Sequence, residues 1–148
     1  MFYNIVNQHR KGNKMVKNEK REEVIRVFRR FARIGLTYQE LNPMQMYKRI
    51  DILCSSRRLK IDMLAVFDTL RLLALNGEED IIEALYVVYF ADPAHRLTRN
   101  EISRRISRLA ADQHCDERTV YRRLERARTL YGQVRHKEGL LLDGVRSN

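Results

Sequence analysis

The chain has 148 residues and a net charge of +10 at neutral pH, long enough for one domain with its own core. The charge is uneven, because residues 1–36 carry +7, residues 37–93 carry −3 and residues 94–136 carry +6. Such basic blocks indicate a polyanionic partner, nucleic acid before an anionic membrane surface. No apolar run approaches the ~18 residues that cross a membrane. Neither Cys54 nor Cys115 has metal-site spacing, so we expect a reduced cytosolic chain without metal or cofactor.

The first third of the chain predicts an arm and a helix. Residues 1–18 are polar and basic without clear periodicity, which predicts a flexible basic arm. Residues 19–34 have helical spacing, and Gly35 is the expected helix stop. The apolar positions of this helix are Val24, Val27, Phe28 and Phe31, and its basic positions are Arg26, Arg29, Arg30 and Arg33. The basic face is either solvated or a second surface that contacts DNA.

The middle of the chain predicts three more helices. Asn42 and Pro43 are an N-cap and a first helical residue, and residues 59–75 form the most apolar helix. Residues 78–90 are apolar nearly all round, so they are buried on several sides, either within the chain or at a dimer interface. The expected helix ends lie near Ser55–Ser56, at Asn76–Gly77 and at Asp92–Pro93. We therefore predict that residues 19–93 are a helical N-terminal region that dimerises or contacts a protein partner.

Residues 94–136 contain two helix starts. Thr98 and Glu101 have the spacing of a capping box, and Asp116 can accept from the N–H of Arg118 or Thr119. The apolar positions are Ile102, Ile106, Leu109 and Ala110 in the first helix, and Val120, Leu124, Ala127 and Tyr131 in the second. Two capped amphipathic helices with many arginines predict an all-α bundle with a C-terminal helix-turn-helix.

The end of the chain leaves two structural choices open. The second helix either stops at Gly132 or runs on to about His136. Residues 137–148 are predicted to be a tail, in which the Leu140–Leu142 run forms either a strand or an apolar clip against the bundle.

The second helix of this pair carries the candidate DNA contacts, because a recognition helix enters the major groove with its N-terminal residues nearest the bases. The residues predicted to contact bases are Glu117, Arg118, Thr119 and Arg122. The residues predicted to contact phosphates are Thr98, Arg99, Arg104, Arg105, Arg123 and Arg126. Tyr121 and Tyr131 lie at or beside core positions and are expected to pack. The sequence contains no nucleophile–base–acid set, so no catalytic residue is predicted.

The motif resembles a known group of proteins. Glu101–Ser103 followed by Asp116–Leu124 is similar to the helix-turn-helix of sigma-factor region 4, and more closely to late transcriptional regulators of the ArpU/RinA type from phages of Gram-positive bacteria. The resemblance covers roughly residues 78–131 and implies a protein that activates late genes with the host RNA polymerase. Glu101 and Val120 are nineteen positions apart, long for a compact motif. Either the first helix is extended, or an ordered loop surrounds residues 111–114.

These observations lead to a ranked set of functions. The first is a non-enzymatic, sequence-specific regulator that binds double-stranded DNA as a homodimer in the bacterial host cytoplasm. The alternative is a DNA-recognition component of a packaging machine, similar to a small terminase subunit, although its helix-turn-helix is typically N-terminal. An enzyme ranks last because a catalytic set is missing, and RNA ranks below duplex DNA because the sequence lacks an aromatic platform.

Overall fold

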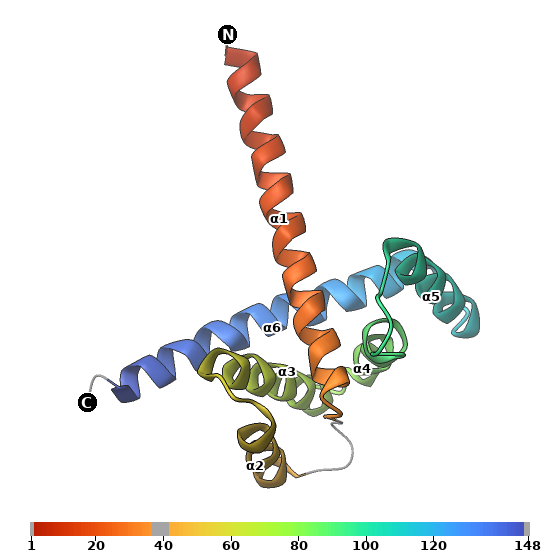
Figure 1. Cartoon of the computed structure of the whole chain (residues 1–148). Helices are drawn as coiled ribbons and strands as arrows, with labels where there is room; N and C mark the ends of the chain where they lie inside the picture. The colour runs from red at the N-terminus through yellow and green to blue at the C-terminus, as the bar shows by residue number, and fades with distance from the viewer. Residues whose placement is uncertain (1, 37–41, 147–148) are drawn as a thin grey trace.

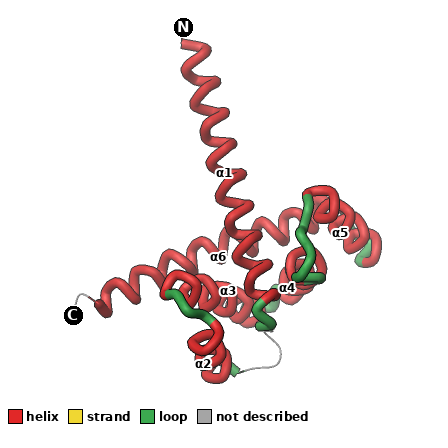
Figure 2. The backbone as a smooth tube through the Cα atoms, viewed as in Figure 1, coloured by secondary structure: helices red, strands yellow, loops and turns green. Residues whose placement is uncertain are grey.

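The chain folds into helices, and over the part that the structure describes there is no strand (Figures 1 and 2). The computed structural model describes residues 2–36 and 42–146. The elements are α1 (Phe2–Arg33), α2 (Pro43–Leu53), α3 (Arg57–Leu75), α4 (Glu79–Leu85), the π-helical turn η1 (Tyr86–Phe90), α5 (Arg99–Asp112) and α6 (Glu117–Arg146). The predicted all-α fold class is confirmed.

Local signals set most helix ends where the sequence predicted them. Asn42 and Gln45 form a reciprocal capping box at the start of α2, with Pro43 as the first helical residue. Gly35 and Gly77 follow α1 and α3 with positive φ angles of 87° and 73°, a conformation that glycine adopts without a steric penalty. These ends depend on a few neighbouring residues, which is why the sequence alone predicts them.

The structure differs from the prediction at both ends of the chain. The arm expected at residues 1–18 is helical from Phe2, and α1 continues through it to Arg33 without a break. Residues 1–18 contain no proline, and the Lys, Arg, Gln and Met residues among them favour a helix even without an apolar stripe. Residue 1 of the expected arm and residues 147–148 of the expected tail lie outside the described residues.

The predicted tail is also helical, because α6 runs past both of its possible stops to Arg146. Gly132 and Gly139 lie inside this helix, and the Leu140–Leu142 run is neither a strand nor a separate clip. An interior glycine costs roughly 1 kcal/mol relative to alanine, which a long helix packed along its length can absorb. Leu140 and Leu141 remain exposed at this end.

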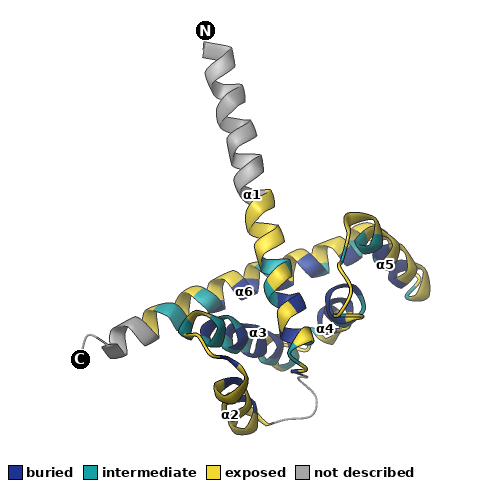
Figure 3. Ribbon diagram, viewed as in Figure 1, coloured by how far each residue is buried: buried dark blue, intermediate teal, exposed yellow. Residues whose placement is uncertain are grey.

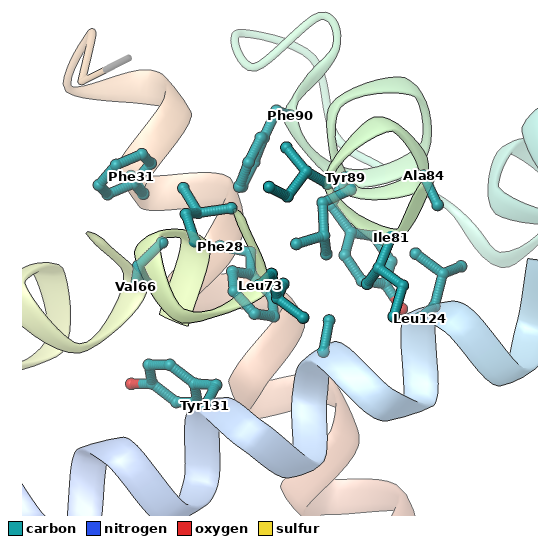
Figure 4. Close-up of a cluster of buried hydrophobic side chains, with 14 of the residues drawn as sticks. Phe28, Phe31, Val66, Leu73, Ile81, Ala84, Tyr89, Phe90, Leu124 and Tyr131 are labelled. Carbon is teal, nitrogen blue, oxygen red and sulfur yellow. The ribbon is translucent and has the colours of Figure 1, made fainter. Parts of the chain in front are cut away.

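The core lies where α1 crosses α6, with α3, α4 and η1 packed around the crossing (Figures 1 and 4). Phe28 of α1 is fully buried at its centre. Its ring centroid lies 5.9 Å from Tyr89, 6.0 Å from Phe90 and 5.5 Å from Tyr131. The prediction that residues 78–90 are buried on several sides is therefore met within the chain itself.

A polar cluster joins the second half of α6 to α3. The Arg135 guanidinium donates to the Asp62 carboxylate at 2.7 Å, and the Tyr131 hydroxyl lies 3.5 Å from the same carboxylate. Burial, together with the nearby Asp68 carboxylate, raises the pKa of Glu138 from 4.5 to about 9. Both effects favour the protonated form of Glu138 in the folded chain.

Replacing Glu138 with glutamine is expected to remove a pH dependence of stability. Because the folded pKa is the higher one, the carboxyl stabilises the fold fully below pH 4.5 and loses that contribution as pH rises toward about 9. The uptake or release of one proton on unfolding changes the free energy of unfolding by about 1.4 kcal/mol per pH unit. This value is the upper limit for the slope of the free energy of unfolding against pH. Urea unfolding followed by far-UV circular dichroism at pH 5, 6.5 and 8 measures it. The exposed control Glu83→Gln should keep the wild-type slope, and a Glu138→Gln variant that also keeps it would contradict the assignment.

Candidate nucleic-acid interface

The start of α5 and the turn before α6 have the geometry that the caps predicted. The Thr98 hydroxyl accepts from the Glu101 N–H at 3.2 Å, and the Asp116 carboxylate accepts from the Arg118 N–H at 3.3 Å. The reciprocal half of the predicted capping box is wrong, because the Glu101 carboxylate pairs with Arg104 and Arg105 instead of with the N–H of Thr98. These two arginines lie one turn further on, where helical spacing brings them within reach of Glu101.

The long spacing between Glu101 and Val120 results from the length of the first helix of the pair. α5 extends to Asp112, and only residues 113–116 separate it from α6. His114 has a left-handed φ of 52°, and the N–H groups of His114 and Cys115 donate to the carbonyls of Ala111 and Ala110. This is a Schellman ending, which reverses the chain in few residues. Of the two alternatives, the extended first helix is therefore correct.

The inner faces of α5 and α6 pack on each other and on the core. The buried residues are Ile106, Leu109 and Ala110 of α5, and Val120, Leu124 and Ala127 of α6. On the flank of α6, Arg123 pairs with Asp80 at 3.1 Å, and Arg126 pairs with Glu78 at 3.4 Å. These ion pairs join α6 to α4, so the orientation of α6 is set from two sides.

The outer face of α6 presents two of the four residues predicted to contact bases. Arg118 and Arg122 are both exposed on it. Thr119 is only partly exposed, and Glu117 accepts a hydrogen bond from the Ser107 hydroxyl of α5 at 2.5 Å. The structure therefore brings Arg118 and Arg122 together on the surface, one helical turn apart, and ties Glu117 to the neighbouring helix.

Tyr121 belongs to the same outer face, which the sequence interpretation missed. Its side chain is 46% exposed, so the prediction that it packs is wrong, whereas Tyr131 is buried as predicted. The available signal was its position one residue after Val120 and three before Leu124, which turns it away from the buried stripe. An exposed tyrosine beside Arg118 and Arg122 adds a flat apolar surface to a basic one.

The residues predicted to contact phosphates fall into two groups. Thr98, Arg99 and Arg104 lie at the exposed start of α5, with the Arg99 and Arg104 side chains 85% and 67% exposed. Arg123 is paired with Asp80 of α4, and Arg126 is paired with Glu78, the N-cap residue of α4. Arg105 is only 13% exposed and donates to the backbone carbonyls of Val88 and Ala91 at 2.9 and 3.0 Å. The second group, Arg105, Arg123 and Arg126, joins helices of the fold to one another, because acids and carbonyl oxygens of other elements lie within reach of these side chains.

A buried arginine of α1 holds the loop that precedes α5. The Arg29 guanidinium donates to the carbonyl oxygens of Tyr89 (2.7 Å), Ala91 (2.7 Å), Asp92 (2.8 Å) and His95 (2.5 Å). Burial, and then the nearby Arg105, lowers the pKa of Arg29 from its ordinary value. The sequence placed Arg29 on a basic face with Arg26, which is incorrect, because Arg29 is 5% exposed and Arg26 faces solvent. Arg29 thus positions the start of α5 relative to α1.

Comparisons with family models, curated proteins and solved structures found no match for this chain. The resemblance to late regulators of the ArpU/RinA type therefore rests on the motif residues alone. Within residues 2–36 and 42–146, no group of three His, Cys, Asp or Glu side chains is placed to hold a metal ion. No described helix is both long and apolar enough to span a membrane.

Proposed function

We propose that this chain is a sequence-specific double-stranded DNA-binding protein that regulates transcription. The observation that carries the proposal is the exposed pair Arg118 and Arg122, at the N-terminal end of a helix whose opposite face is buried. A helix presented in this way fits the major groove, where an arginine can donate two hydrogen bonds to O6 and N7 of a guanine. α5 and α6 would then act as the two helices of a helix-turn-helix.

The start of α5 supports the same orientation on DNA. Thr98 caps the helix, and the exposed Arg99 and Arg104 lie in its first two turns. The N-terminus of a helix favours a phosphate through its free N–H groups and its dipole. Phosphate contacts of this kind fix the position of a protein on the duplex without determining the sequence that it prefers.

The biological setting follows from the resemblance. We propose an activator of phage late genes that works with the host RNA polymerase in the bacterial cytoplasm, as a homodimer. A measurement of molar mass by light scattering, free and on DNA, checks the dimer. A strict monomer in both states would remove that part of the proposal and leave DNA binding in place.

Replacing Arg118 and Arg122 with alanine is expected to abolish the preference for one DNA segment. Each bidentate contact to guanine is worth ~1–3 kcal/mol of discrimination, or about 5- to 160-fold in relative affinity. Binding of purified protein to labelled duplexes that span the genes beside its own measures the preference over a range of salt concentrations. Weak residual binding to all duplexes should remain, because the basic surface is otherwise intact.

The matched control is the pair Lys48→Ala and Arg49→Ala. Both side chains are exposed on α2, so the control removes the same charge away from α6. It should keep the segment preference of the wild type. Equal binding of the wild type to every duplex would overturn the proposal of sequence-specific recognition.

A further inference from the structure

An open groove of about 1550 Å³ runs along α1, between this helix and the elements that it crosses. On one side of α1, its wall is formed by the loop before α5, by α5 as far as Ile106, and by Tyr121, Leu124 and Arg128 of α6. The groove residues on this side that concern us are Arg21, Arg26, Arg96, Arg99, Tyr121 and Arg128. We call this side the arm groove. Figure 3 shows the exposed part of α1 next to its crossing with α6.

The groove is strongly basic. Nine arginines line it against three acidic residues, counting both sides of α1. Each of those acids already has an arginine partner, since Glu22 pairs with Arg99, Glu23 with Arg58 and Asp62 with Arg135. Arg26 and Arg96, by contrast, form no ion pair with any residue that the structure describes, and both are exposed. The excess positive charge is therefore available to an outside anion.

The arm groove is continuous with the outer face of α6. Tyr121 lines the groove, and it is exposed on α6 beside Arg118 and Arg122, which do not line the groove. Burial raises the pKa of the Tyr89 hydroxyl, and the nearby charges of Arg128 and Arg21 partly offset this effect. Arg21 of α1 and Arg128 of α6 both line this groove together with Tyr89, whose hydroxyl accepts from Arg128 at 2.7 Å. A ligand bound to the outer face of α6 would therefore also contact α1 where the groove adjoins that face.

The position of α1 beside this groove is held firmly. The Arg99 guanidinium donates to the Glu22 carboxylate at 3.1 Å, which links α1 to the first residue of α5. Arg29, one to two turns further along α1, holds the preceding loop through four backbone carbonyls, as described above. Arg21 and Arg26, two of the five arginines of α1 that line the groove, therefore lie on a helix that is joined to α5 and to the loop before it.

We propose that the arm groove binds the sugar–phosphate backbone of the same DNA duplex whose bases α6 contacts, with α1 as a clamp along one strand. This inference rests on the proposed function and adds a second contact surface to it. A duplex is favoured as the occupant because the groove opens directly from the helix face that fits a major groove. Arginines that contact only phosphates add affinity and salt dependence without adding sequence preference.

The test compares Arg21→Gln with Arg26→Gln, combined in one variant, against the control Lys48→Gln with Arg49→Gln. All four side chains are exposed, and each variant loses two charges. The probes are one duplex that carries the preferred segment and one with the same composition in scrambled order. The α1 variant should bind both duplexes about 10-fold or more weakly than the control. Its plot of log affinity against log salt should be shallower by about 2, because roughly 0.9 counterions are released per phosphate contacted.

The outcomes separate this inference from the proposed function. If the α1 variant behaves like the control while Arg118→Ala and Arg122→Ala lose the preference, the clamp is wrong and the function stands. If the wild type prefers no duplex but the α1 variant is still weaker than the control, the groove binds backbone and sequence-specific regulation is wrong. Tighter binding of single-stranded RNA of equal length than of either duplex would overturn the choice of DNA as the occupant.

Discussion

Replacing Phe28 with alanine is expected to lower the free energy of unfolding by about 4 kcal/mol, within the range of ~3–5 kcal/mol seen when buried phenylalanines are truncated. Phe28 is 0% exposed, and its ring packs against Tyr89 and Phe90 of η1 and against Tyr131 of α6. The substitution would remove the α1 side chain that packs against all three of these rings, whereas Phe31, also of α1, keeps its contact with Phe90 at 5.8 Å. Rings on both sides of the cavity cannot collapse into it without moving whole helices.

Urea unfolding followed by far-UV circular dichroism measures this effect, with two further variants as controls. Phe28→Leu keeps most of the volume and should cost about 1–1.5 kcal/mol. Leu72→Ala truncates a side chain of α3 that is 39% exposed and should cost less than about 1 kcal/mol. A loss below about 1 kcal/mol for Phe28→Ala would show that the α1–α6 crossing is not the centre of the core.

Replacing Arg29 with methionine is expected to cost about 3 kcal/mol, the second largest effect. A hydrogen bond to a charged group contributes ~1.5–3 kcal/mol, and carbonyls that lose a buried partner add the cost of desolvation. The variant removes the guanidinium donor from the Tyr89 carbonyl of η1 and from the Ala91, Asp92 and His95 carbonyls of the loop before α5. Ala91 keeps its bond from Arg105, and Asp92 keeps its bond from the His95 N–H. Methionine keeps much of the side-chain volume, so the loss reports on the hydrogen bonds more than on a cavity.

The matched control is Arg26→Met, one turn earlier on α1. Arg26 is exposed, so its replacement should change the free energy of unfolding by less than about 0.5 kcal/mol. The free energy of unfolding of Arg29→Lys should lie between those of Arg29→Met and Arg26→Met. A single ammonium group cannot donate to all four carbonyl oxygens that the planar guanidinium contacts. Equal stability of Arg29→Met and Arg26→Met would show that the loop holds its position without the guanidinium.

The Arg29 variant also bears on the proposed function, because the loop that it holds leads into α5. If that loop is released, Thr98 and Arg99 lose their fixed position relative to α6. DNA affinity should then fall further than stability alone explains, at a temperature where the variant is still folded. A folded Arg29→Met variant with wild-type DNA affinity would show that the position of this loop does not affect DNA binding.

The sequence by itself determined the fold class and most helix starts. Asn42, Thr98 and Asp116 act as caps where their residue types predicted, and the apolar periodicity identified the buried faces of α5 and α6. These features depend on contacts within about four residues along the chain, which local sequence encodes directly. The exposed pair Arg118 and Arg122 follows from the same periodicity.

Only the tertiary structure decided which arginines face solvent and which brace the fold. Arg29 and the Tyr89 carbonyl are 60 residues apart, and Arg126 and Glu78 are 48 residues apart. Helical spacing assigned Arg105 to phosphate, yet it lies against the end of η1, where free carbonyls attract a cation. A long, flexible guanidinium binds whatever acceptor the packing of distant helices brings within reach, and local sequence does not encode that proximity.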